Sequence, residues 1–169
     1  MTPYMYTSSV PVFKQLLSSL SAILVKAEAF AMEKKFESKV LLDARLFPDM
    51  FPLSRQVQIA TDFAMSVSAR LAEVEVPAYD NNDQSMAELQ ERISKALIFI
   101  DSLTAAQFEG SDVREIILRP GTPKEKTLRG HNYLSNYGLP QFFFHVTTAY
   151  DILRHNGLDV GKGDFMGAY

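Results

Sequence analysis

Apolar residues recur every three or four positions in four separate segments of this chain, and each segment predicts an amphipathic helix with one buried face. The segments span residues 10–35, 54–71, 85–103 and 140–157. The third has the clearest start, because Ser85 and Glu88 stand at the spacing of a capping box. The fourth begins near Pro140, a favoured first-turn residue, and stops at Gly157, which tolerates the left-handed conformation after a helix end.

The helical spacing of apolar residues is lost between the third and fourth segments. Two short strand-like runs, residues 114–119 and 124–129, surround the turn-forming sequence Pro-Gly-Thr-Pro at 120–123. This pattern predicts a β-hairpin, followed by a loop at residues 129–134. Four helices with one longer crossing connection indicate an all-α four-helix bundle with a small hairpin inserted before the last helix, forming a single domain over residues 1–169.

Composition narrows the classes of function. A chain of 169 residues that is 47% hydrophobic builds one core. Its formal charge of -3 supplies no basic field for nucleic acid. The absence of cysteine excludes disulfides, thiolate nucleophiles and Cys-ligated zinc, and is compatible with a reducing cytoplasm. No apolar run approaches the ~18 residues of a membrane span. We therefore expect a soluble cytoplasmic protein without nucleic-acid or membrane partners.

His145 is the main chemical feature of the fourth segment. On a helical wheel at about 100° per residue, it lies on the same side as Phe142 and Ile152, so it points into the core. The same wheel places Gln56 on the apolar arc of the second segment. Asp62 falls on the opposite side, where we expect solvent to surround it.

A buried imidazole needs hydrogen-bond partners to offset its desolvation. The candidate pocket residues around His145 are Gln56, Gln141, His131, Asn132 and Tyr133. Among the histidines, only His131 could approach His145, by folding over the end of the bundle, since His155 lies ten residues along the same helix, or ~15 Å away. Three roles stay open for His145: a hydrogen-bonded core residue, part of a ligand pocket, or a metal ligand.

The sequence "HVTTAYDILRHNG" at 145–157 resembles the last helix of the DinB/YfiT-like superfamily of four-helix bundles. Together with "RLFPDMFPLSRQVQ" at 45–58, it is similar to a bacterial branch of that superfamily without an assigned function. The resemblance implies a bundle of that topology, often dimeric, with a pocket among the helices near one end. In active members three histidines hold a divalent metal, and some members transfer low-molecular-weight thiols onto electrophiles.

The metal ligands that this resemblance implies are largely replaced here. His145 matches the second histidine of the family's His-x-x-x-His pair, whereas the first position is Gln141. The histidine expected on the second helix falls at or near Ala60, and Gln56 is the inward polar group nearby. Zinc or nickel sites need about three good donors, and a glutamine amide is a poor one. His145 is thus the one candidate metal ligand of this set.

Two classes of function follow. The favoured class is a metal-independent binding or interaction protein whose degenerate metal pocket holds a small ligand. The alternative is a divalent-metal enzyme of the DinB/YfiT type, a thiol transferase or hydrolase-like protein, with zinc or nickel as cofactor. Whether the protein is catalytic stays open at this point.

The outward side of the fourth helix favours a homodimer. Phe143, Tyr150 and Arg154 form one narrow stripe there, and aromatic residues and arginine are enriched at interface centres. Phe142 belongs to the core and Phe144 is expected at an intermediate position. The hairpin or the C-terminal tail, folding back within one chain, is the alternative cover for this stripe.

Overall fold

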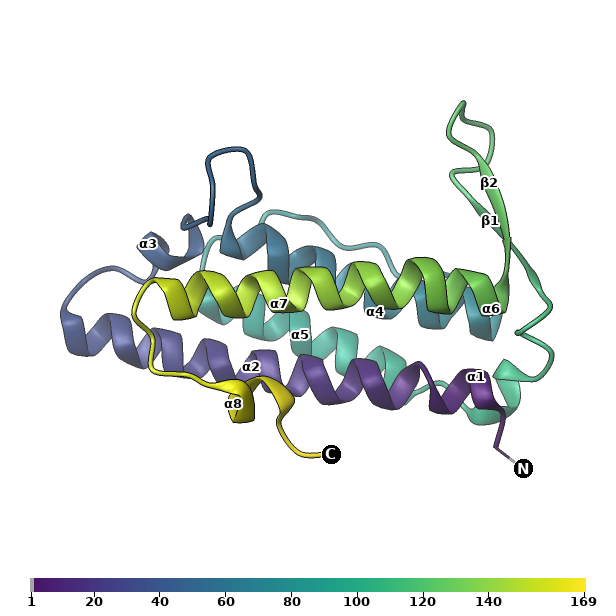
Figure 1. Ribbon diagram of the computed structural model, residues 1–169, viewed down its shortest axis with the longest axis horizontal. Helices are drawn as coiled ribbons and strands as arrows, with labels where there is room; N and C mark the ends of the chain where they lie inside the picture. Colours follow the sequence, from purple (N-terminus) through teal and green to yellow (C-terminus); the bar gives the residue numbers. More distant parts are fainter. Residues whose placement is uncertain (1) are drawn as a thin grey trace.

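The computed structural model describes residues 2–169 and consists of four long helices packed side by side (Figure 1). These are α2 (Val10–Lys34), α4 (Leu53–Ala72), α5 (Met86–Asp101) and α7 (Leu139–His155). Shorter elements connect them: α1 (Tyr4–Thr7), α3 (Lys39–Leu42), the 3-10 turn η1 (Ala105–Phe108), β1 (Glu115–Leu118), β2 (Lys126–Arg129), α6 (Gly130–Tyr133), the π turn η2 (Leu134–Gly138) and α8 (Lys162–Met166). The predicted all-α bundle with a hairpin is confirmed.

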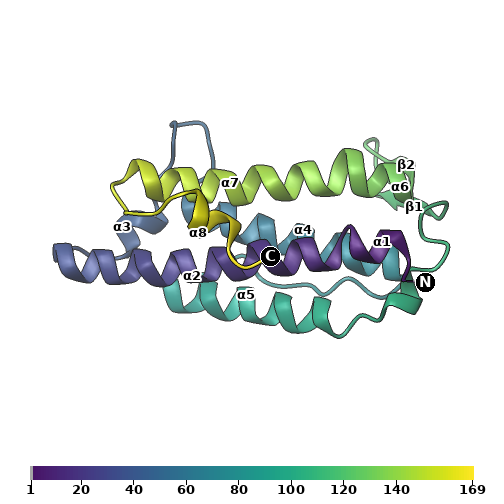
Figure 2. The ribbon, with the colours of Figure 1, turned by 60° about the horizontal axis from the view of Figure 1, so that its bottom comes forward.

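Helices α2 and α7 run in one direction along the bundle, and α4 and α5 run in the other (Figures 1 and 2). Because α4 and α5 are consecutive and parallel, the linker at residues 73–85 returns along the length of the bundle between them. The sequence predicted one longer crossing connection without placing it, and the structure places a crossing connection at residues 73–85. This linker also brings a polar segment of the chain alongside the helices.

The helix ends follow local rules. Ser85 caps α5, and its Oγ accepts a hydrogen bond from the backbone N–H of Glu88 at 3.2 Å. The Glu88 carboxylate reaches back to the N–H of Gln84 at 2.6 Å, one residue earlier than a standard capping box. Gly157 has φ +92 after the end of α7, which is the left-handed conformation predicted for it.

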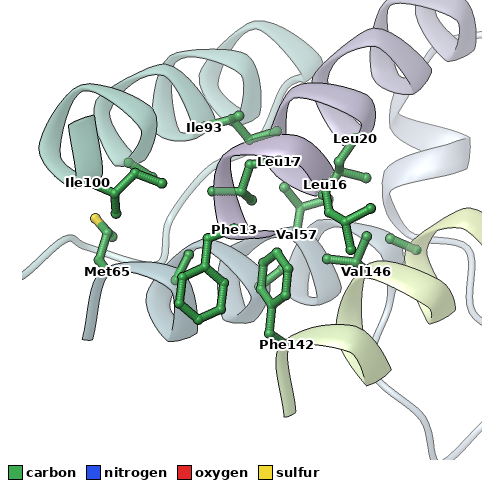
Figure 3. Packing of buried hydrophobic residues seen from close by; sticks show 14 of the residues in the cluster. Phe13, Leu16, Leu17, Leu20, Val57, Met65, Ile93, Ile100, Phe142 and Val146 are labelled. Atoms are coloured by element: carbon green, nitrogen blue, oxygen red, sulfur yellow. The ribbon is translucent and has the colours of Figure 1, made fainter. Parts of the chain in front are cut away.

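The core runs along the bundle where all four long helices meet. Phe13 of α2 and Phe142 of α7 pack edge to face with ring centroids 4.8 Å apart, and aliphatic side chains such as Leu17, Val57 and Ile93 surround them (Figure 3). All of these side chains are fully buried. The side chains predicted to face inward in the four segments therefore share one core.

The hairpin projects from one end of the bundle (Figure 1), with β1 antiparallel to β2 and Glu115 opposite Arg129. The segment after it is helical, which corrects the loop expected at residues 129–134. Helix α6, the π turn and α7 follow one another directly, so the last helical stretch begins at Gly130 rather than near Pro140. Proline lacks the N–H that an α-helix uses, and the wider π turn just before Pro140 accommodates that loss.

The stretch Tyr4–Lys34 is long and apolar enough to cross a membrane by length and composition alone, contrary to the expectation that no run would approach that limit. Half of its most apolar window is buried inside the bundle. The side chains of Leu17, Leu20 and Leu24 are fully enclosed. A core helix of a globular domain accounts for this composition.

Candidate functional site

His145 and Gln56 meet inside the bundle. The Nδ1 atom of His145, on α7, lies 2.7 Å from Oε1 of Gln56, on α4. The amide nitrogen of Gln56 donates to the backbone oxygen of Phe51 at 3.1 Å. His145 is 7% exposed and Gln56 is 1% exposed. The contact between these two side chains is the one that their inward positions on the helical wheel predict.

These contacts fix the tautomer of the imidazole. Since Gln56 uses its amide N–H₂ toward the Phe51 carbonyl, its oxygen faces His145 and can only accept. The proton of His145 therefore resides on Nδ1, and Nε2 carries a lone pair. Within residues 2–169 no protein group donates to Nε2. The ring is thus a hydrogen-bond acceptor held in one orientation.

The electrostatic surroundings keep this imidazole neutral. Burial, and secondarily the positive charge of Arg55, lower the pKa of His145 from 6.5 to about 4. Both effects disfavour the charged form of the ring. At neutral pH the Nε2 lone pair is consequently available to bind a donor, accept a proton or contribute one bond to a metal.

Aromatic rings surround His145. Phe63 of α4 stacks on the imidazole with centroids 6.1 Å apart, and Phe144 meets it edge-on at 5.2 Å. Phe144 is 55% exposed, which corrects the intermediate position expected for it. Phe51 is also exposed and lies beneath the guanidinium of Arg55, 5.9 Å from its ring centroid. One solvent-facing ring, Phe144, therefore contacts His145, and a second, Phe51, belongs to the residue whose carbonyl accepts from Gln56.

Gln141 lines a cavity of about 240 Å³ on the outer side of α7 and the π turn. Tyr137 and Phe144 also form its walls. Phe144 contacts His145, but His145 itself does not line this cavity. Gln141 and His145 thus share a neighbour, although no hydrogen bond joins them in the part of the chain that the structure describes.

His131, Asn132 and Tyr133 lie far from His145. All three are on α6, in the same continuous helical stretch, and fourteen residues of helix correspond to about 20 Å. His131 and Asn132 are exposed, whereas Tyr133 is buried and accepts a hydrogen bond from Arg70 at 3.2 Å. The approach of His131 over the end of the bundle, which the sequence left open, does not occur, because residues 130–133 are helical rather than a loop.

The donors around His145 do not fit a three-ligand metal site. Among residues 2–169, no three His, Cys, Asp or Glu side chains come close enough together to hold a metal ion. The nearest polar side chain is Gln56, whose oxygen is already bonded to the Nδ1 proton. An ion bound here would therefore have one protein nitrogen, Nε2 of His145, and no second imidazole.

The outward stripe of α7 is partly covered by the C-terminal tail. Tyr150 is half-buried, its ring packs edge-on against Phe165 of α8 at 5.8 Å, and its hydroxyl donates to the carbonyl of Val160 at 3.4 Å. Arg154 lies 3.6 Å from Asp159. Phe143 keeps 39% of its surface exposed. The tail thus covers Tyr150, as the intrachain alternative predicted, and leaves Phe143 available to a partner.

A buried arginine on α5 organises the linker, and the helical wheel did not reveal it. The guanidinium of Arg92 donates five hydrogen bonds, at distances between 2.6 and 3.1 Å. Its acceptors are Thr61 and Asp62 of α4 together with Asp80, Asn81 and Asp83 of the linker. Asp62, expected in solvent, is in fact paired with Arg92 at 2.6 Å. The signal was a lone arginine beside Leu89, Ile93 and Ala96, following a linker rich in acids and amides.

Together, the bundle topology, the hairpin before α7 and the inward histidine on α7 define a DinB-like four-helix bundle of unknown function. A solved structure of a DinB family member protein from Shewanella denitrificans is 41% identical to the chain, with a TM-score of 0.91 over 97% of this chain and 92% of that one. The chain belongs to the family described as a domain of unknown function, DUF1993, whose model matches residues 5–166. A search of the curated proteins gives no match.

Proposed function

We propose that this protein is a metal-independent binding protein in which Nε2 of His145 accepts a hydrogen bond from a small ligand. One observation carries the proposal: Gln56 occupies Nδ1 at 2.7 Å and leaves a neutral, oriented acceptor without a protein partner in the described chain. Nε2 is not among the buried atoms that lack a partner, so it reaches solvent and is open to a ligand.

The surroundings indicate the class of ligand. A neutral acceptor binds a hydroxyl or N–H donor, and the exposed ring of Phe144 beside His145 favours an aromatic or otherwise flat apolar body. Arg55 adds positive charge near the ring, which disfavours cationic donors such as ammonium groups. We therefore assign a small neutral aromatic molecule that carries a hydroxyl or N–H group.

The test compares phenol with anisole, which has a similar ring but lacks the donor. With ¹⁵N-labelled histidine, phenol should shift the Nε2 resonance of His145 saturably, and anisole should leave it unchanged. The phenol response should disappear in His145→Phe and persist in His155→Ala, a change at an exposed histidine on the same helix. Equal responses to phenol and anisole, or none to phenol, would refute the proposal.

The divalent-metal enzyme is the competing candidate, since the Nε2 lone pair is also the atom that would bind zinc or nickel. Elemental analysis of protein purified without a histidine tag separates the two functions. We expect less than stoichiometric metal, because one imidazole is a weak site. Stoichiometric metal that is lost in His145→Ala would establish the metal function instead.

A homodimer in the cytoplasm completes the proposal. Support comes from the exposed ring of Phe143 on α7 and from the cysteine-free composition. Light scattering should give twice the mass of one chain for the parent and a monomer for Phe143→Glu. A monomeric parent, or a dimer that Phe143→Glu leaves intact, would rule out this interface.

A further inference from the structure

A second cavity, of about 220 Å³, lies where the end of β1 approaches α4. Two arginines line it, Arg70 from α4 and Arg119 from the hairpin. Its other walls include Phe63, Leu118 and Tyr137, which are largely apolar. The cavity therefore combines two guanidinium groups with an apolar surface.

Arg119 borders this cavity because of an unusual backbone conformation. Successive side chains of a strand point to opposite faces, so Arg119 should face away from Leu118. Both nevertheless line the same cavity, and Arg119 has φ +51, a left-handed conformation that is unfavourable for a residue other than glycine. The turn at Arg119 thus breaks the alternation, at an energetic cost, and places this charged residue on the cavity that α4 also borders.

Neither guanidinium is neutralised by the protein. Across residues 2–169, no carboxylate lies within salt-bridge distance of Arg70 or Arg119. Arg70 donates from Nη1 to the carbonyl of Ser66 at 3.4 Å and to the hydroxyl of Tyr133 at 3.2 Å, which leaves its other N–H groups unused. Asp62 also borders the cavity, but its carboxylate is held by the buried Arg92 at 2.6 Å.

We propose that this cavity binds the carboxylate of a small aromatic acid. Guanidinium groups match a carboxylate in charge and in planar, bidentate geometry, and the rings of Phe63 and Tyr137 with Leu118 would contact the apolar body. The cavity volume of about 220 Å³ suits a single ring with its carboxylate. The inference does not depend on the His145 site, although Phe63 contacts both His145 and Tyr137.

Benzoate, titrated at constant ionic strength, is the probe, and inorganic phosphate is the matched anion without an apolar body. Benzoate should bind saturably and shift the side-chain Nε–H resonances of Arg70 and Arg119. In Arg119→Gly the affinity should fall at least tenfold, and glycine retains the left-handed backbone, so the fold is preserved. Arg70→Lys should also weaken binding, because lysine keeps the charge but loses the bidentate geometry.

Two control variants test whether benzoate binds at this cavity rather than elsewhere on the bundle. Arg154→Gln removes an exposed arginine at the other end of α7 and should leave benzoate affinity unchanged. His155→Ala, at an exposed position on α7, should also bind benzoate normally. Non-saturable shifts, equal benzoate affinity in Arg119→Gly, or phosphate binding as tight as benzoate would overturn the inference.

Discussion

Arg92 and His145 are both buried polar side chains that bridge helices of the same bundle, and their hydrogen bonding differs. Arg92 makes five hydrogen bonds to α4 and the linker, which satisfy its whole guanidinium. His145 makes one, to Gln56, and its second ring nitrogen has no protein partner in the described chain. A side chain such as Arg92, whose donors are all used, stabilises the fold. A side chain such as His145, which is held in one orientation and has a free acceptor, is suited to binding a ligand.

We therefore expect substitutions of Arg92 and His145 to lower the free energy of unfolding by different amounts. The largest loss is expected for Arg92. Arg92→Met would leave Asp62 and the half-buried Asp83 without their cation and would release the linker. Breaking one partner of a buried ion pair costs about 3–5 kcal/mol, and since Asp62 is 37% exposed we expect the lower end of that range. Urea unfolding measures the loss.

Lys95→Met is the matched control for Arg92→Met. Lys95 is an exposed residue on the same helix, paired with Glu91 at 2.7 Å. An exposed pair of this type contributes less than about 1 kcal/mol. If the two substitutions cost the same, the Arg92 cluster is not the structural centre that its hydrogen bonds indicate.

The titration of His145 should make the free energy of unfolding depend on pH. Its folded pKa of about 4 lies below the ordinary value of 6.5, so the unfolded chain binds the proton more readily. Stability is therefore fully present above about pH 7 and falls as the pH drops from 6.5 toward 4, by up to about 3 kcal/mol at 1.4 kcal/mol per pKa unit. The difference in unfolding free energy between the parent and His145→Gln, measured from pH 7 to 4, isolates this contribution from that of the carboxylates. A constant difference over that range would show that the imidazole titrates normally.

Gln56→Leu should lower the free energy of unfolding by less than Arg92→Met does. The substitution leaves the Nδ1 proton of His145 without its acceptor, which costs about 1–3 kcal/mol. Gln141→Leu provides the control on α7, because Gln141 makes no hydrogen bond to His145 in the described chain, and it should change stability by less than about 0.5 kcal/mol. Chemical denaturation at pH 7 gives both values. Equal stability of Gln56→Leu and the parent would mean that the Gln56–His145 bond contributes nothing to the fold.

The difference between these two regions also explains which features could be predicted from the sequence. Helical periodicity located all four long helices within one or two residues at most ends, and it placed Gln56 and His145 on facing sides of α4 and α7, since both depend on a local pattern. The Arg92 cluster joins α4, the linker and α5, so no single periodic segment contains it. The helical α6 and the π turn were missed because Pro140 favours a helix start, whereas an irregular turn lets the helix continue through it.

The smallest effect on stability is expected at Phe144, and it distinguishes a ligand site from a core contact. Phe144 is 55% exposed and touches His145 edge-on, so Phe144→Ala removes little buried surface and should cost less than about 1 kcal/mol. Phe142→Ala, two residues away and fully buried, should cost about 3–5 kcal/mol. If Phe144 lines the ligand site, Phe144→Ala should still weaken the phenol response at His145 by several-fold while unfolding at nearly the parent urea concentration. A stable variant that binds phenol as the parent does would show that Phe144 does not line the ligand site.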